Sequence, residues 1–184
     1  MRGLAPIAPE SARVLVLGSF PSAASLELGE YYGFARNHFW ALLALAFGEA
    51  EPGSWAEKRA LLERRNVALW DVIAACDREG SLDGAIRNEE PNDVLGLLAE
   101  RPRVARVALN GGKAADSFRK LLAPELPAGL AIGETVAWRP AALAPRAFSV
   151  CRLPSTSPIP TRDFRGLGDK AGLWKAFLSP EGPL

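Results

Sequence analysis

Cysteine and histidine are scarce in this chain of 184 residues, which has two cysteines and one histidine. A zinc site made of several cysteines and histidines, or a four-cysteine iron–sulfur cluster, therefore cannot form within one copy. A serine–histidine–aspartate triad would need His38 as its base, because the chain has no other histidine. We expect a protein without a metal or any other cofactor.

Long apolar runs are also missing. Charged or polar residues interrupt every run well short of the ~18 residues that a membrane-spanning helix needs. The first residues, Met1 to Pro6, lack the apolar core of a secretory signal. Together with the low cysteine content, this predicts a cytoplasmic protein with reduced thiols and no membrane contact.

The chain has no strong charge of either sign, since its formal net charge is +1. Any surface that binds nucleic acid must therefore be a local basic patch. Solvated surface is the ordinary alternative for such side chains. The candidates for a patch lie in or near the loops described below: Arg36, Lys113, Arg152, Arg162, Arg165 and Lys170.

Four short runs rich in valine and leucine are typical of buried parallel strands: residues 13–17, 67–73, 104–109 and 148–153. Helical patterns lie between them. This alternation predicts the α/β class, as a three-layer α/β/α sandwich around a mainly parallel four-stranded sheet. With no internal repeat and no linker, we expect a single domain over residues 1–184.

The helix starts are marked by capping residues. Ser54 and Glu57 form a capping box for a helix over 55–65, and Asn37 and Asn92 are the expected caps of helices over 38–47 and 93–100. Further helices are predicted over 113–122 and 163–178, the latter with a break near 166–168. We expect residues 123–146 to form an irregular excursion in which residues 132–138 are extended.

Two polar loops directly follow predicted strands. The first covers 18–26, after the first strand, and the second covers 153–158, at the end of the fourth. Ligands of open α/β sheets bind at the carboxyl ends of the strands. We therefore expect the two loops, far apart in sequence, to frame one cleft.

Six short motifs carry a family resemblance. They are 18–22 (Gly-Ser-Phe-Pro-Ser), 31–33 (Tyr-Tyr-Gly), 36–40 (Arg-Asn-His-Phe-Trp), 70–72 (Trp-Asp-Val), 110–114 (Asn-Gly-Gly-Lys-Ala) and 153–158 (Leu-Pro-Ser-Thr-Ser-Pro). In their order and their places at strand ends, they resemble the uracil-DNA glycosylase superfamily. Within it, the chain looks most like the hypoxanthine (deoxyinosine) DNA glycosylase family.

The resemblance implies an enzyme of DNA repair. It would bind DNA that contains a deaminated base, flip that base out of the helix and hydrolyse its N-glycosidic bond, leaving an abasic site. Hypoxanthine is the expected base and a monomer the expected state. A lyase step needs an amine nucleophile. Lys113 is the only lysine in a matched motif, so we expect a monofunctional glycosylase.

Asn37 is the expected catalytic residue. Many members of the superfamily carry an activating Asp or Asn where this chain has Phe20, and His or Asn where it has Ser155. In the hypoxanthine family the catalytic amide is attributed to the Asn of an Asn-x-Phe-Trp element, which Asn37 matches. An amide can hold a water without titrating. The alternative is that Asn37 only caps its helix.

Tyr32 is the expected stacking residue, because related mismatch-specific enzymes carry an aromatic residue five positions before the catalytic amide. Phe20 and Tyr31 are alternatives, and all three could instead pack the loop. Asn110 ends a predicted strand, and its amide could read the edge of a base. Its alternative is a turn before two glycines. Gly18 and Ser19 complete the expected base-binding set.

The second loop is the expected DNA-binding segment. Its hydroxyl and backbone N–H groups suit contacts with phosphates, and its prolines stiffen it. Ile159 occupies the place where relatives insert an apolar wedge into the emptied base stack. The alternatives are an ordinary polar turn and a core contact for Ile159. The full set is Ser155, Thr156, Ser157, Pro158, Ile159 and Arg162.

Two further residues have open roles. Asp71 ends the second predicted strand and could face the cleft as a carboxylate or cap the following turn. His38 could contact phosphate or be a solvated residue at a helix start. Two other functions also stay open: excision of uracil or another pyrimidine from mismatches, and a non-catalytic nucleic-acid-binding module.

Overall fold

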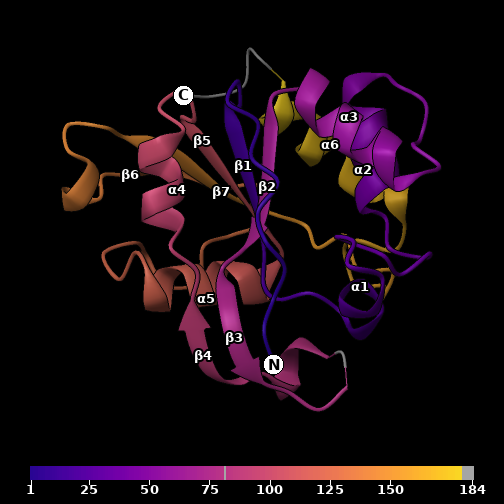
Figure 1. The fold of residues 1–184 in the computed structure, drawn as a ribbon, viewed down its shortest axis with the longest axis horizontal. Helices are drawn as coiled ribbons and strands as arrows, with labels where there is room; N and C mark the ends of the chain where they lie inside the picture. The colour runs from indigo at the N-terminus through magenta and orange to yellow at the C-terminus, as the bar shows by residue number, and fades with distance from the viewer. Residues whose placement is uncertain (81, 180–184) are drawn as a thin grey trace.

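Five strands form the central sheet of the computed structural model, which describes residues 1–80 and 82–179 (Figure 1). Their order is β2-β1-β5-β7-β6. Four are parallel, namely β1 (Val14–Gly18), β2 (Val67–Asp71), β5 (Arg106–Asn110) and β7 (Phe148–Leu153), and β6 (Thr135–Trp138) pairs antiparallel with β7. Residue 81 and residues 180–184, which the predicted domain includes, lie outside the described residues.

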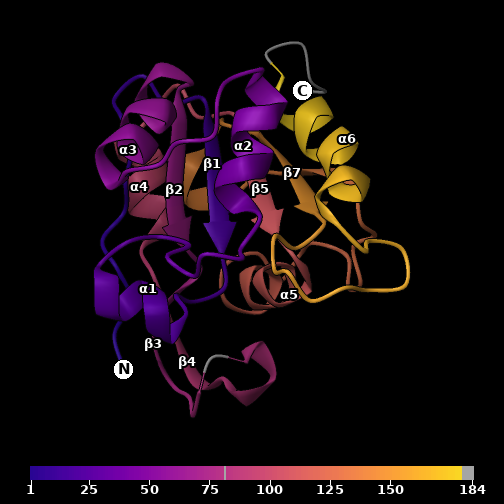
Figure 2. The same ribbon diagram turned by 90° about the vertical axis from the view of Figure 1, so that its right-hand side faces the viewer.

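The helices cover both faces of the sheet, which confirms the three-layer α/β/α sandwich (Figures 1 and 2). One face carries α2, α3 and α6, and the other carries α4 and α5. The six helices of the described residues are α1 (Ala23–Leu28), α2 (Phe39–Phe47), α3 (Trp55–Arg64), α4 (Val94–Glu100), α5 (Gly112–Leu121) and α6 (Leu167–Leu178), with short 3-10 turns η1 (Asp83–Ala85) and η2 (Ala141–Leu143).

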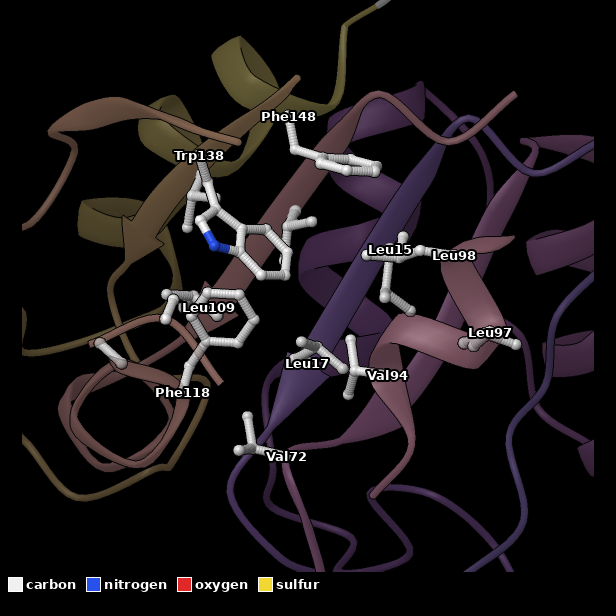
Figure 3. Packing of buried hydrophobic residues seen from close by; sticks show 14 of the residues in the cluster. Leu15, Leu17, Val72, Val94, Leu97, Leu98, Leu109, Phe118, Trp138 and Phe148 are labelled. Atoms are coloured by element: carbon white, nitrogen blue, oxygen red, sulfur yellow. The ribbon is translucent and has the colours of Figure 1, made fainter. Parts of the chain in front are cut away.

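Side chains alternate between the two faces along each strand. In β1, Leu15 and Leu17 join the core under α4 and α5, whereas Val14 and Val16 join the core under α2, α3 and α6. Figure 3 shows the first of these cores, in which Phe118 and Trp138 pack edge to face with ring centroids 4.9 Å apart. Because both of its faces are buried, β1 is apolar along its whole length rather than alternating.

Two expectations about the strands were wrong. Within residues 1–80 and 82–179 the sheet has five strands rather than four, because part of the 123–146 excursion forms β6 at the edge. The run over 67–73 is not one strand. β2 ends at Asp71, and β3 (Ile73–Asp77) leaves the sheet to form an antiparallel hairpin with β4 (Arg87–Pro91). The charged β4 sequence, Arg-Asn-Glu-Glu-Pro, gives no strand signal.

The helix caps agree with the sequence at α3 and differ at α4. Ser54 and Glu57 form the predicted capping box. At α4 the predicted cap, Asn92, is wrong. Asp93 accepts a hydrogen bond from Gly96 N at 2.9 Å, while the Asn92 side chain donates to the carbonyl of Asp71 at 2.9 Å. The last helix begins at Leu167 rather than at residue 163, since the chain is extended at Gly166.

The amino-terminal segment runs beside β2, where Ile7 forms a bridge with Leu69. It therefore covers part of an edge that could otherwise pair with another chain. No helix in the described part of the chain has the length and apolar character to cross a membrane.

Candidate active site

A cleft of about 770 Å³ lies at the carboxyl ends of the parallel strands. Its walls come from the two polar loops, the segment before α2 and the η1 turn of the hairpin. In Figure 2, α1 and the hairpin lie beyond the arrowhead of β1, at this end of the sheet. The predicted site residues that line the cleft are Gly18, Ser19, Phe20, Tyr32, Asn37, Asn110, Ser155, Thr156, Ser157, Pro158 and Ile159. Arg162 does not line it and is exposed.

Asn110 joins the two loops at the end of β5. Its Nδ2 donates to the hydroxyl oxygen of Tyr32 at 2.8 Å and to Oγ1 of Thr156 at 2.9 Å. Its Oδ1 accepts a hydrogen bond from the backbone N of Thr156 at 2.9 Å. Both N–H donors of the amide are therefore used within the protein. These contacts make Asn110 a positioning residue, and its reading of a base stays a prediction.

Tyr32 is held in place on the cleft wall. Its ring stacks on that of Phe39, with centroids 4.0 Å apart and planes at 17°. Its φ of 52° lies in the left-handed region, which a non-glycine residue adopts only at a cost. Burial and the carboxyl of Asp71 raise the pKa of Tyr32, so its hydroxyl keeps its proton.

The two alternatives to Tyr32 as a stacking residue are less open. Tyr31 is buried, and its hydroxyl donates to the carbonyls of Leu4 and Ala5, so it anchors the amino-terminal segment. Phe20 lines the cleft but is 6% exposed, and the guanidinium of Arg78 lies 5.0 Å from its ring centre.

Glycine is required at two points of the cleft because other chain segments approach closely. A Cβ on Gly18 would lie 2.3 Å from Oδ1 of Asp71. A Cβ on Gly111 would lie 2.8 Å from Cβ of Ser155, and Gly111 also has a φ of 92°. These glycines let Asp71 and the second loop reach the floor of the cleft.

Asp71 lies at the end of β2, in register with Gly18, and lines the cleft. Its side chain is 3% exposed, and Oδ2 is buried without a hydrogen-bond partner among the described residues. Burial, reinforced by the charge of Asp83, raises the pKa of Asp71 to about 8, against the opposing effect of Arg78. Of its two expected roles, the structure shows the carboxyl in the cleft and no cap.

Asn37 lies at the start of α2 and lines the cleft. Its Oδ1 accepts a hydrogen bond at 2.9 Å from the backbone N of Phe39, the first residue of α2. The predicted cap is wrong by one position, since the N-cap residue is His38. Its side-chain NH2 has no hydrogen-bond partner within the described residues, and Oδ1 retains a second lone pair. The amide thus has a fixed orientation and the capacity to hold a water, and its bond to the start of α2 is compatible with the catalytic role.

The second loop divides into buried and exposed parts. Thr156 is 1% exposed and faces Asn110, so its side chain does not offer the predicted phosphate contact. Ser155 and Ile159 are exposed, and Ser157 is partly exposed. The exposure of Ile159, 61%, excludes the core contact considered as its alternative.

A buried lysine ties this loop to α2 and α6. Lys170 Nζ donates to the carbonyl of Ser157 at 2.7 Å and lies 3.3 Å from Nδ1 of His38. The backbone N of His38 donates to the carbonyl of Thr156 at 2.9 Å. Burial lowers the pKa of Lys170, and burial together with Lys170 lowers that of His38. The side chains of Lys170 and His38 therefore support the second loop from the side of α2 and α6.

The basic patch is smaller than the sequence suggests. Arg152 turns inward and donates to the carbonyl of Leu130 at 2.9 Å, and Lys113 pairs with Glu89. The candidates that stay exposed for contact with phosphates are Arg36, Arg162 and Arg165.

Comparison with known proteins now decides the family. Residues 5–177 match the Uracil DNA glycosylase superfamily. The chain belongs to this superfamily. It is therefore a DNA N-glycosylase, a hydrolase of N-glycosyl bonds.

Two curated relatives of the glycosylase, from Methanosarcina acetivorans and Methanosarcina barkeri, are each named "Hypoxanthine DNA glycosylase". They are 38% and 34% identical over 116 residues, which is 62% of this chain and 73% of each relative. A solution NMR structure of a candidate uracil DNA glycosylase from Methanosarcina acetivorans has 31% sequence identity and a TM-score of 0.72, and the match covers 96% of this chain and 95% of that one.

Sequence reasoning underestimated two parts of the glycosylase site. The first is Asp71, whose signal was its place at a strand end in the same register as Gly18. The second is the β3–β4 hairpin, which brings Leu82 and Asp83 to the cleft, with Ser19 Oγ donating to Asp83 Oδ1 at 2.8 Å. No local pattern in the sequence predicts the hairpin, because β4 is charged.

Proposed function

We propose that this glycosylase removes hypoxanthine from DNA, by flipping deoxyinosine into the cleft and hydrolysing its N-glycosidic bond. The observation that carries the proposal is the convergence of eleven predicted site residues on one cleft, from both polar loops and the residue after the second, from the segment before α2 and from β5. The names of the two curated relatives support hypoxanthine as the base.

The chemistry needs few groups. Cleavage leaves positive charge on the sugar and moves an electron pair onto the departing base. The oriented amide of Asn37 holds the attacking water, and the ring of Tyr32 packs against the extruded base. The backbone of Gly18 and Ser19 lines the cleft beside it.

The rim of the cleft engages the DNA. Ser155 and Ser157 offer hydroxyl groups, and Arg36 and Arg162 offer positive charge to the phosphates. Ile159 enters the base stack as the nucleotide leaves it, which offsets part of the unstacking cost of a few kcal/mol.

The enzyme is monofunctional in this proposal. None of the described residues that line the cleft is a lysine, and Lys113 is committed to Glu89. A Schiff-base step has no amine there. We further propose that it acts as a monomer in the cytoplasm, where the free thiols of Cys76 and Cys151 stay reduced.

A substrate panel tests the proposal. Duplexes with hypoxanthine, uracil or xanthine are incubated with excess enzyme, and abasic sites are cleaved with alkali. We expect the highest single-turnover rate with hypoxanthine. Faster excision of uracil or xanthine would overturn the substrate assignment, and binding without any cleavage would indicate a non-catalytic module.

Asn37→Ala tests the catalytic role. We expect the single-turnover rate to fall by roughly 10²-fold, as for other losses of one positioned polar group in a preorganised site. Stability should fall by about 1 kcal/mol, because the hydrogen bond from the first residue of α2 to Asn37 is lost. The matched control is Ser54→Ala, which removes the cap of α3 outside the cleft and should cost similar stability without slowing excision. A normal rate for Asn37→Ala would leave that residue with a structural role at the start of α2 alone.

A further inference from the structure

Asp71 differs from every other described residue of the cleft in one respect. It has a buried side-chain oxygen, Oδ2, with no hydrogen-bond partner. Burying such a group unpaired costs about 1–3 kcal/mol, so its retention at the floor of a cleft points to a partner that arrives with the ligand. The missing Cβ of Gly18 is what lets this carboxyl occupy the floor.

The surroundings favour the neutral acid. Asp83 adds a second negative charge from the hairpin. Arg78 is the nearby cation, but its Nη2 donates to the carbonyl of Pro21 at 2.7 Å and its guanidinium lies over Phe20. A neutral carboxyl has one O–H donor beside one carbonyl acceptor, whereas an ionised one only accepts.

We propose that Asp71, as a neutral acid, hydrogen-bonds the extruded base and donates to it while the glycosidic bond breaks. This inference rests on the proposed function. Its donor and acceptor suit a base that presents a carbonyl oxygen beside a ring N–H, as deaminated bases do. The hydrogen bond would lie on the atom group that gains negative charge as the base leaves.

The step balances without another reactant. The oxygen of water bonds to C1′ of the sugar, and the bond from C1′ to the base breaks with its electron pair going to the base. Water loses one proton and the base gains one, so the products are a neutral base and an abasic site. Asp71 starts and ends protonated. An ionised Asp71 would repel the departing base instead.

The two tyrosines near Asp71 do not lose their protons near pH 8, so they do not mask the transition of Asp71. Tyr31 and Tyr32, from the segment before α2, and Asp83 and Arg78, from the hairpin side, are the charged or titratable groups that act on it. Burial raises the pKa of both tyrosines above its ordinary value of 10.0. They therefore stay neutral while Asp71, with a pKa of about 8, loses its proton.

The first test is a pH profile of single-turnover excision with the hypoxanthine duplex. For the wild type we expect a plateau at lower pH and a fall of about tenfold per pH unit above the pKa of Asp71. Asp71→Asn keeps a donor and an acceptor but cannot ionise. Its rate should be flat with pH and should exceed that of the wild type at high pH. Glu90→Gln, at an exposed acid in β4, should keep the wild-type profile. Parallel profiles for Asp71→Asn and the wild type would overturn the proposal.

The second test does not depend on excision. The carboxyl carbon of Asp71 is followed by ¹³C NMR, assigned by its loss in Asp71→Asn, with and without a duplex that carries a non-hydrolysable 2′-fluoro deoxyinosine. We expect the pKa of Asp71 to rise by about one unit or more on binding, because the base prefers the neutral acid. An unchanged or lowered pKa would overturn the role of Asp71. Absence of hypoxanthine excision in the wild type would overturn the proposed function, and this measurement would still decide on Asp71.

Discussion

The two sides of the cleft floor use their polar side chains in opposite ways. On the side of β5 and β7, the amide of Asn110 makes three hydrogen bonds that lock Tyr32 and Thr156. On the side of β1 and β2, Asp71 keeps a buried oxygen that has no hydrogen-bond partner in the described part of the chain. The first side fixes geometry during folding. The second keeps hydrogen-bonding capacity for a ligand, at the expense of stability.

The sharpest test of this contrast is the stability of Asp71→Asn at high pH. The pKa of Asp71 is raised from 3.8 to about 8 in the folded protein, so the folded state binds its proton more tightly than the unfolded state. Wild-type stability should therefore fall as pH rises from about 4 to about 8.

At pH values of about 9 we expect Asp71→Asn to be more stable than the wild type by several kcal/mol, since each unit of pKa shift corresponds to ~1.4 kcal/mol. Near pH 4 the two proteins should be alike. Urea unfolding at both pH values measures the difference. A destabilised variant at high pH would mean that the carboxylate has a stabilising partner, and the contrast would be lost.

Removing the hydrogen bonds of Asn110 should lower the stability of the protein, which is the opposite of the effect expected for Asp71→Asn at high pH. Asn110→Ala removes three hydrogen bonds and leaves the N–H of Thr156 without its acceptor, which should lower stability by roughly 2–4 kcal/mol. Ser155→Ala, at an exposed hydroxyl of the same loop, should cost less than about 1 kcal/mol. Equal losses in the two variants, measured by urea unfolding, would show that Asn110 does not organise the floor.

The smallest expected effect is at the rim. Ile159→Ala should slow excision from fully paired duplex by roughly threefold to tenfold and leave single-stranded substrate nearly unchanged, because a wedge helps only where a base leaves a stable stack. Leu82→Ala is the matched control, an exposed leucine on the hairpin side of the same cleft. Equal slowing on both substrates would assign Ile159 to the shape of the loop.

The parts of the fold that the sequence predicted are those determined by local signals. The apolar runs around Leu15 and Val107 are buried on both faces, so their composition alone marks them as parallel strands. The capping box of α3 is equally local. By contrast, β4 is a charged segment that becomes a strand only because β3 pairs with it. Sequence reasoning has no access to that pairing.

The candidate site also has a part that the sequence predicted and a part that it did not. Strand ends meet at one edge of a parallel sheet, so the sequence could bring Asn110 and the second loop to one cleft. It could not show that the donors of Asn110 are used by Tyr32 and Thr156, because those partners lie 78 and 46 residues away. The lack of a hydrogen-bond partner for Asp71 Oδ2 among the described residues likewise depends on which side chains the hairpin and the first loop place near it.

The left-handed backbone conformation of Tyr32 affects the free energy of binding an extruded base. The φ of 52°, the stack on Phe39 and the bond from Asn110 all exist before any nucleotide arrives. The ring of Tyr32 is therefore fixed in position during folding and is not rearranged when the base binds. Little ordering entropy remains to be lost when the base enters, so more of the free energy of association is left to pull that base from its helix.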